Sequence, residues 1–154
     1  MKIITDNRRA RHDYFVLDAF EAGIELRGTE VKSLRQGHIT LKDSYADVVG
    51  GELFLVGAHI EQYAQGNIYN HVPERRRRLL MHKREIIKLA SQVQEKGLTL
   101  IPLKLYFKDG KVKVEVGLCR GKHTHDKRQA IQDRESKIEV QRALRDANKG
   151  KANE

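Results

Sequence analysis

The sequence predicts a mainly β protein: a small, closed or nearly closed antiparallel barrel with two helices packed on it, followed by a basic C-terminal tail. Two tight-turn signals, Gly50-Gly51 and Asp109-Gly110, each lie between two strand-like runs, which is typical of β-hairpins. Residues 112–118 alternate apolar and polar side chains, as a strand with one buried face does. Residues 122–154 have only four aliphatic side chains larger than alanine, so they cannot supply a core of their own.

The first half of the chain begins with two short strand patterns. Residues 14–17 form an apolar run, and residues 22–26 alternate as a half-buried strand does. A short helix is expected next, with Thr29 as its N-cap and Gly37 as its C-terminal stop. Helical spacing places three residues on one face of this helix: Val31, Leu34 and Arg35.

The Gly50-Gly51 turn joins two expected strands at residues 44–49 and 52–60. The second run has apolar side chains on both faces, and this pattern predicts a central strand. Residues 62–73 are polar and contain glycine, which predicts a loop.

A long helix is predicted at residues 79–95, because apolar side chains recur there at helical spacing and Gly97 follows as a stop. The strands of the second hairpin follow at residues 98–107 and 112–118. Pro102 lies inside the first of them. Since proline cannot donate a hydrogen bond to a neighbouring strand, it predicts an edge strand or a bulge.

We expect one folded domain at residues 1–121 and a separate tail at residues 122–154. The tail is compatible with a helix from about residue 129 to residue 146. Its few apolar side chains cannot offset the entropy lost on ordering, so we expect it to be disordered when free.

The positive charge is concentrated in two segments. The chain has 30 Lys and Arg against 21 Asp and Glu, a net charge of +9. Residues 73–88 hold seven bases and two acids (+5) and residues 120–154 hold ten and six (+4), whereas residues 15–72 hold four and eight (−4). Clusters of one sign attract polyanions, so nucleic acid is the first candidate partner. A basic surface that serves only solubility is the alternative.

Composition disfavours several other classes of protein. Binding to a membrane surface calls for a basic amphipathic helix with bulky aromatics, but the chain has no Trp, five Tyr and four Phe. No run approaches the roughly 18 apolar residues of a membrane span, and the start carries no apolar signal segment. The single cysteine, Cys119, excludes a disulfide scaffold and a Cys-rich zinc site. We therefore expect a soluble, cytoplasmic protein with no membrane partner.

No motif predicts catalysis. The seven histidines include no His-Glu-x-x-His pair, and His123 with His125 would leave a metal short of ligands. Residues 117–122 resemble a phosphate-binding loop only loosely, because three residues separate the glycines and His123 stands where Ser or Thr is required. Acids within residues 15–72 could hold a nuclease metal, but their spacing singles out no set. We expect no enzyme activity, no metal and no cofactor.

Features typical of RNA binding are stronger. Four consecutive arginines at 75–78 stand at the start of the predicted long helix, and arginine both pairs with phosphate and stacks on bases. The alternative is that Leu79 and Leu80 dock the helix while the arginines solvate its start. Positive charge at a helix N-terminus is unfavourable, which favours a polyanion partner and makes Arg75 and Arg77 candidate RNA contacts. Nearby side chains that could supply stacking planes are Tyr63, Tyr69, His71 and His82.

Motifs along the whole chain resemble one protein family. They are Phe20-Glu21-Ala22-Gly23-Ile24, Gly28 to Arg35, Asp43-Ser44-Tyr45-Ala46, Asn70-His71, Pro73 to Leu80, Gly97 to Leu103, Lys113 to Gly117, Gly121-Lys122 and Asp126-Lys127-Arg128. In order and with few gaps from Asn7 to Leu144, they are similar to the bacterial tmRNA-binding family, small protein B (SmpB). The chain departs from the family, which is more uniformly rich in Ala and Lys, at Cys119-Arg120 and His123-Thr124.

The resemblance implies an oligonucleotide-binding-type β-barrel with flanking helices and no catalysis of its own. It implies binding to the transfer-RNA-like domain of transfer-messenger RNA (tmRNA) and delivery of that RNA to stalled ribosomes for trans-translation. The body would stand in for the anticodon arm. The tail would become helical in the empty mRNA channel of the small subunit, against its ribosomal RNA. Elongation factor Tu would be an indirect partner, through aminoacylated tmRNA.

The resemblance also implies roles for particular residues. Those that match the tmRNA-binding surface are Glu21, Arg35, Leu80 and Lys113, with Asn7 and Tyr14 nearby. Those that match the tail segment of the decoding centre and mRNA channel are Gly121, Lys122, His125, Asp126, Lys127 and Arg128. Arginine and lysine suit phosphate or sugar contacts and Leu80 suits an unstacked base, while Glu21 could orient a base or form a structural ion pair. Two alternatives stay open: a general RNA-binding barrel, ribosomal or chaperone-like, and a basic RNA-processing nuclease.

Overall fold

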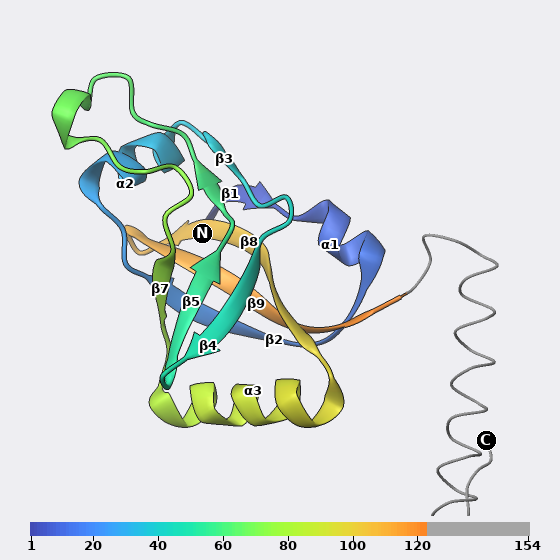
Figure 1. The fold of residues 1–154 in the computed structure, drawn as a ribbon. Helices are drawn as coiled ribbons and strands as arrows, with labels where there is room; N and C mark the ends of the chain where they lie inside the picture. Colours follow the sequence, from blue (N-terminus) through green and yellow to red (C-terminus); the bar gives the residue numbers. More distant parts are fainter. Residues whose placement is uncertain (123–154) are drawn as a thin grey trace, which may run out of the picture. The chain divides into compact units, whose positions relative to one another are not determined.

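The computed structural model describes residues 1–122, and for Asn67 the backbone only. Residues Met1–Arg120 form one compact unit. Its helical elements are α1 (Arg8–Asp13), α2 (Gly28–Arg35), the 3₁₀ turn η1 (Asn67–Tyr69) and α3 (Lys83–Lys96) (Figure 1). Its strands are β1 (Lys2–Asp6), β2 (Tyr14–Ile24), β3 (Ile39–Thr40), β4 (Tyr45–Val49), β5 (Glu52–Val56), β6 (His59–Ile60), β7 (Arg77–Leu80), β8 (Thr99–Lys108) and β9 (Lys111–Gly121).

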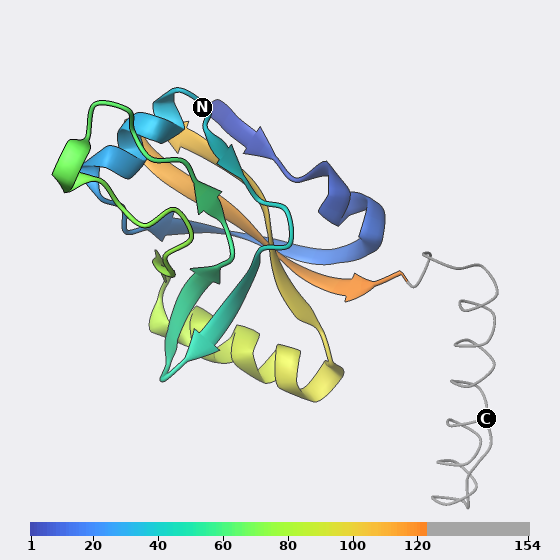
Figure 2. The same ribbon diagram turned by 45° about the horizontal axis from the view of Figure 1, so that its top comes forward.

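Six strands form a closed ring, which confirms the predicted barrel. Their order is β8-β4-β5-β7-β2-β9, and β9 pairs again with β8 to close the circuit. The ring is seen obliquely in Figure 2. Strand β1 joins the sheet outside the ring, on β8, and β3 with β6 forms a separate two-stranded ribbon. Two contacts of the ring are short, because β2 pairs with β7 only at Gly23 and Ile24 and β4 pairs with β8 only at Ala46.

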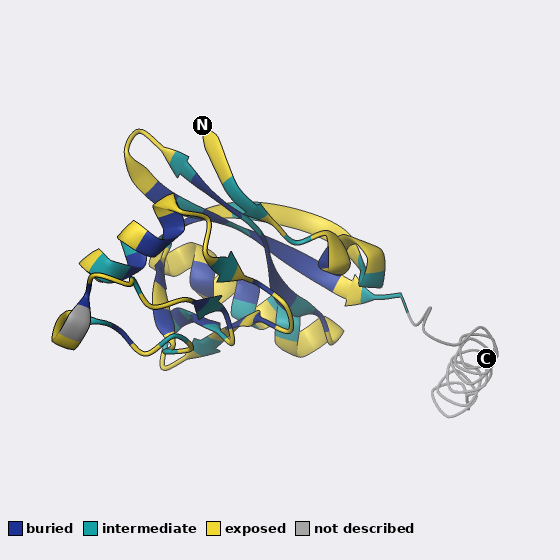
Figure 3. Ribbon diagram, turned by 90° about the horizontal axis from the view of Figure 1, so that it is seen from above, coloured by how far each residue is buried: buried dark blue, intermediate teal, exposed yellow. Residues whose placement is uncertain are grey.

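The core fills the inside of this ring. Alternate residues of each strand point inward, so that Leu53 and Leu55 of β5 and Val114 and Val116 of β9 are fully buried. Figure 3 shows buried stretches along the strands, with exposed residues on turns and outer surfaces. Helix α3 crosses one end of the barrel in Figure 1 and adds Ile86 and Leu89 to the same core. A smaller cluster lies beside α1 and consists of Ala10, Ile101, Leu103 and Cys119.

Both predicted hairpins are present. The turn between β4 and β5 places Gly50 and Gly51 at φ values of 60° and 80°, and the turn between β8 and β9 places Asp109 and Gly110 at 52° and 77°. Two consecutive left-handed residues define the hairpin turn that glycine and aspartate favour. Strand β5 lies between β4 and β7, which confirms a central strand. The predicted strand at residues 52–60 is too long, because Gly57, at a φ of 83°, separates β5 from β6.

Pro102 marks a bulge, one of the two predicted alternatives. The register between β8 and β9 shifts between Pro102 and Lys104. The other alternative, an edge strand, is wrong. Before the bulge Leu100 pairs with β4, and after it residues 104–107 pair with β1, while β9 runs along the other side of β8. The bulge therefore lies where β8 exchanges one neighbour for another.

The predicted long helix starts too early. Its first residues belong to β7, in which Leu79 pairs with Leu53 of β5 and Leu80 pairs with Gly23 of β2. Helix α3 begins at Lys83, and Gly97 ends it with a φ of 63°, as predicted. Leu79 and Leu80 fit the apolar spacing of a helix as well as that of a strand. Their pairing with β5 and β2 determines that they form a strand.

The start of α2 also differs from the prediction. The helix begins at Gly28 with Arg27, not Thr29, at the N-cap position. The reason is Glu30, whose carboxylate accepts the Arg27 backbone N–H at 2.7 Å. Strand β1 and helix α1 were not predicted, and β2 is continuous from Tyr14 to Ile24 where two separate strands were expected.

Within the part of the chain that the structure describes, no helix is long and apolar enough to cross a membrane. Of the predicted tail at residues 122–154, all but Lys122 lies outside the described residues.

Candidate nucleic-acid interface

A hollow of about 390 Å³ lies on the outside of the barrel between β2, α2, β7 and the β8–β9 hairpin. We call it the Leu80 hollow. It is lined by Gly23, Ile24, Leu26, Val31, Leu80, Gly110, Lys111, Val112 and Lys113. Its wall is apolar on the β2, α2 and β7 side and carries two lysines on the hairpin side. That combination suits a ligand with a flat apolar part and a negative charge, which describes a nucleotide.

Gly23 keeps the Leu80 hollow open. In β7, Leu79 points into the core and Leu80 points outward, where it is 44% exposed. Its cross-strand partner is Gly23, and a Cβ at Gly23 would lie 3.3 Å from the Leu80 Cβ. Because Gly23 has no side chain, nothing on β2 at this position covers the Leu80 side chain.

Three predicted RNA contacts meet on this outer face. Glu21 shares the outward face of β2 with Gly23, since alternate residues of a strand point the same way. Lys113 points outward from β9 between two buried valines. In the ring β2 lies between β7 and β9, and Leu80 of β7 and Lys113 of β9 line the same hollow. Exposed Arg35 is one helical turn beyond Val31, which lines the hollow.

Glu21 is held in place by hydrogen bonds. The Tyr106 hydroxyl donates to its carboxylate, and Lys108 Nζ lies 3.3 Å from Oε2. The Tyr106 hydrogen bond is the main cause that lowers the pKa of Glu21, with Lys108 and Lys113 adding to it. Glu21 is thus an oriented carboxylate at the edge of a basic surface, not a phosphate ligand.

The interpretation of the four arginines has to be corrected. They alternate along the approach to and start of β7, and Arg77 is fully buried. Its Nε donates to Glu30 at 2.6 Å, and its Nη atoms donate to the carbonyls of Ala58 and Pro73. A guanidinium with no exposed surface cannot reach RNA, so the expectation that Arg77 binds RNA is wrong.

Arg75 shares the same carboxylate. Its Nη2 lies 2.7 Å from Glu30 Oε1, and its side chain is 24% exposed. Burial by itself would raise the pKa of Glu30, but the hydrogen bonds from Arg75 and Arg27 and the charge of Arg77 outweigh burial and lower it. This buried charge cluster of Glu30, Arg75 and Arg77 fastens α2 to the segment before β7.

The two exposed arginines of the run, Arg76 and Arg78, are not among the predicted RNA contacts. Arg76 lies 4.6 Å from the Phe54 ring centroid, and Arg78 pairs with Glu52 at 3.0 Å. In a strand, alternate side chains point to opposite faces, so predicting residues 75–78 as a strand would have distinguished the exposed arginines from the buried or partly buried ones. That alternation was masked by the helical interpretation of the residues that follow.

His71 is also buried, so it offers no stacking plane. It bonds Thr29 through Nδ1 at 2.8 Å and the Ile60 carbonyl through Nε2 at 2.9 Å. Tyr69 is 80% exposed, Tyr63 is partly exposed and His82 is exposed at the N-cap position of α3.

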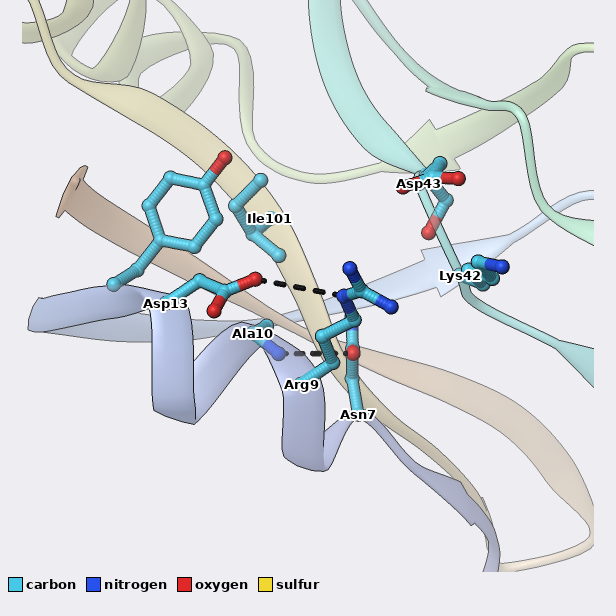
Figure 4. A pocket seen from close by; sticks show the side chains of 9 residues that line it. Asn7, Arg9, Ala10, Asp13, Lys42, Asp43 and Ile101 are labelled. Atoms are coloured by element: carbon cyan, nitrogen blue, oxygen red, sulfur yellow. Dashed lines mark hydrogen bonds and ion pairs between the residues drawn. The ribbon is translucent and has the colours of Figure 1, made fainter. Parts of the chain in front are cut away.

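Asn7 and Tyr14 lie at a different place from the Leu80 hollow. They line a smaller cavity of about 90 Å³ beside α1, shown in Figure 4. The Asn7 side chain accepts the Ala10 backbone N–H at 3.2 Å and donates to the Pro102 carbonyl at 2.9 Å. Arg9, paired with Asp13 at 3.6 Å, lies across this cavity from the segment containing Lys42. Asn7 thus caps α1 and ties it to β8.

Among residues 1–122, no group of three or more His, Cys, Asp or Glu side chains is placed to hold a metal ion. Cys119 is buried, and burial raises the pKa of its thiol to about 11, so it is protonated at neutral pH and packs as a core residue. Of the six predicted tail contacts, Gly121 ends β9 and Lys122 follows it. The other four, His125, Asp126, Lys127 and Arg128, lie outside the described residues.

The chain is similar to known proteins along nearly its whole length. A family model described as SmpB protein matches residues 4–146. The chain belongs to the SmpB family. SmpB-family relatives named SsrA-binding protein include one from Moorella thermoacetica, 57% identical over 150 residues, which cover 97% of each chain. Another, from Desulfitobacterium hafniense strain DCB-2, is 54% identical over 150 residues, which cover 97% of this chain and 96% of the relative.

The fold of this SmpB-family chain also matches a solved structure. That structure is described as "tmRNA-SmpB: a journey to the center of the bacterial ribosome". The TM-score is 0.67 at 48% sequence identity, and the match covers 83% of this chain and 94% of the other.

Proposed function

We propose that this chain binds the transfer-RNA-like domain of tmRNA through the Leu80 hollow and delivers that RNA to stalled ribosomes. The observation that carries the proposal is the meeting of Glu21, Leu80 and Lys113 on one outer face of the barrel. Membership of the SmpB family and the likeness to a tmRNA-SmpB structure support tmRNA as the ligand.

The chemistry of the hollow suggests how each side chain acts. Leu80 offers an apolar surface to an unstacked base, and Lys113 and Arg35 provide charge for phosphate or sugar oxygens. Glu21, oriented by Tyr106, accepts hydrogen bonds from a base edge or holds a neighbouring cation. The binding needs no catalytic group, and we infer that the chain has no enzyme activity of its own.

The later steps belong to the same proposal. The barrel stands in for the missing anticodon arm of tmRNA. Residues Gly121, Lys122, His125, Asp126, Lys127 and Arg128 engage the decoding centre and the empty mRNA channel of the small subunit. Elongation factor Tu takes part indirectly, through aminoacylated tmRNA. These steps place the protein in the cytoplasm, where ribosomes translate.

A competition binding assay tests the choice of RNA. Labelled tmRNA is displaced by unlabelled tmRNA or by transfer RNA at physiological salt, since charge alone gives unselective binding that falls steeply with salt. We expect displacement by tmRNA at a much lower concentration. Equal displacement would instead favour the general RNA-binding barrel.

Paired variants locate the interface. Leu80→Ala and Arg35→Ala should each weaken tmRNA binding about tenfold, the loss of one stacking or phosphate contact. Arg84→Ala is the control, because Arg84 is an exposed base on α3 that does not line the hollow. Equal effects of Arg35→Ala and Arg84→Ala would show a diffuse charge effect.

Deleting the residues after Gly121 separates RNA binding from ribosome signalling. The truncated chain keeps the whole barrel. We expect near-normal affinity for tmRNA and no peptide tagging in a reconstituted translation assay. Equal losses of both would contradict this division of labour. The nuclease alternative is checked by incubating RNA with the protein, magnesium and manganese, and it requires metal-dependent cleavage.

A further inference from the structure

Residues 62–73 form a loop that has no Asp, Glu, Lys or Arg, in a chain of which 33% is charged. We call it the uncharged loop. It contains η1 and connects the β3–β6 ribbon to the segment before β7 (Figure 1). The proposed tmRNA contacts make no use of it.

The uncharged loop exposes its apolar side chains. Ile68 is 87% exposed, Tyr69 is 80% exposed and Val72 is 64% exposed. Single exposed apolar residues are common on protein surfaces, but three within five positions, on a segment without charge, form a patch that marks an interaction site.

The loop is held in one conformation by its own polar groups. The Asn70 side chain accepts the Tyr63 backbone N–H at 3.0 Å and donates to the Tyr63 carbonyl. Gln62 Nε2 donates to the His71 carbonyl at 2.9 Å, while the buried His71 ring bonds Thr29 and Ile60. A loop ordered in advance loses little conformational entropy when it binds.

The chemistry of the patch indicates a protein partner. RNA binding needs cations for phosphate, and the uncharged loop has none. Of the three exposed apolar side chains only Tyr69 has a plane on which a base could stack, whereas Ile68 and Val72 are aliphatic. An apolar pocket on a protein matches these side chains, with Tyr69 as the kind of aromatic anchor that dominates interfaces. The exposed side chain of Lys32 lies 5.3 Å from the Tyr63 ring centroid, and this positive charge beside the loop favours a pocket with an acidic rim.

We propose that the uncharged loop inserts Ile68 and Tyr69 into an apolar, acid-rimmed pocket of a protein in the stalled-ribosome assembly. The inference rests on the proposed function, because that assembly is where the partner is sought. It adds a protein contact to a molecule whose other proposed contacts are with RNA.

Site-specific photo-crosslinking identifies the class of the partner. A benzophenone amino acid replaces Tyr69 in the full chain, which is bound with tmRNA to purified ribosomes stalled at the end of a message. We expect a crosslinked product that survives ribonuclease and contains one ribosome-associated protein by mass spectrometry. A product removed by ribonuclease, a dimer of this chain, or no product above that from a benzophenone at Ile87 would each overturn the proposal.

A polar double variant supplies an independent readout. Ile68→Asn with Tyr69→Asn should lower the affinity of the protein–tmRNA complex for stalled ribosomes at least about tenfold, since anchor residues dominate interfaces. Its tmRNA affinity and thermal midpoint should stay near wild type, because both side chains face solvent. The matched control is Ile87→Asn, at an apolar residue on α3 that is 55% exposed.

Loss of tmRNA affinity in the double variant would make the loop part of the RNA surface and overturn the inference, as would an unchanged affinity for ribosomes. Failure of the proposed function has a different signature, since the wild-type chain itself would then show no preference for tmRNA.

Discussion

Replacing Glu30 with glutamine would test whether the buried charge cluster stabilises the fold. Glu30 and Arg77 have no exposed surface, and their charged groups lie 2.6 Å apart. Glutamine keeps the shape and one acceptor oxygen but leaves the Arg77 charge uncompensated. We expect the free energy of unfolding to fall by about 3–5 kcal/mol, the cost of breaking one side of a buried pair. Domains of this kind are stable by only about 5–15 kcal/mol, so the variant should be marginal.

A matched control comes from an exposed pair of the same chemistry. Glu25 lies 4.0 Å from Arg78, and both side chains are about half exposed. Exposed pairs contribute at most about 1 kcal/mol, so Glu25→Gln should change stability little. The contrast isolates burial, since both substitutions remove one carboxylate facing an arginine.

Urea unfolding followed by circular dichroism measures both variants. With a slope of about 1–3 kcal/mol per molar urea, the Glu30→Gln midpoint should fall by at least about 1 M. A loss below about 1 kcal/mol, or equal losses for the two variants, would refute the assignment of the cluster as a stabilising element.

The pH dependence of the free energy of unfolding tests whether the fold stabilises the charged form of Glu30. The pKa of Glu30 is lowered in the folded chain, so its stabilisation is fully present above the unfolded pKa of about 4.3 and is lost as pH falls through the folded pKa. The stability difference between wild type and Glu30→Gln should therefore be constant above about pH 5.5 and shrink as pH falls below about 4. A difference that widened on acidification would contradict the lowered pKa.

Other substitutions test the hollow and the cap of α1. Gly23→Val adds atoms against Leu80 and should weaken tmRNA binding about tenfold in a filter assay, whereas Gly28→Ala, where a Cβ meets nothing within 4 Å, should not. Lys113→Ala should reduce the slope of log affinity against log salt by about one, and an unchanged slope would exclude a phosphate contact. Asn7→Ala removes the N-cap of α1 and a hydrogen bond to β8, so thermal melts should show a loss of about 1–2 kcal/mol.

Local patterns predicted the parts of the fold that local chemistry determines. Consecutive left-handed residues at Gly50-Gly51 and Asp109-Gly110 fix two hairpins, and the alternation in residues 112–118 gives the inner face of β9 correctly. Gly97 ended the long helix as expected, because its left-handed conformation suits glycine.

The errors arose where distant residues decide the structure. Leu79 and Leu80 continue a helical period, yet pairing with β5 and β2 makes them strand. The sequence around Arg77 predicts a surface base, because the ion-pair partner that buries it, Glu30, lies 47 positions earlier in the chain. In the candidate site, motif resemblance indicated Glu21, Leu80 and Lys113, but the role of Gly23 in exposing Leu80 depends on the register of two strands, which single-sequence patterns do not contain.

The order in which the ring closes determines when the protein can fold during its own synthesis. Strand β1 pairs with residues 104–107 of β8, far along the chain. The ring of strands stays open until β9 pairs with both β8 and β2. A nascent chain that has exposed only β1 to β5 can pair β4 with β5 alone, because the partners of β1, β2 and β3 come later in the chain. Folding must therefore wait until residues 111–121 have emerged. The barrel proposed to rescue stalled ribosomes cannot close until the ribosome that makes it has passed residue 121.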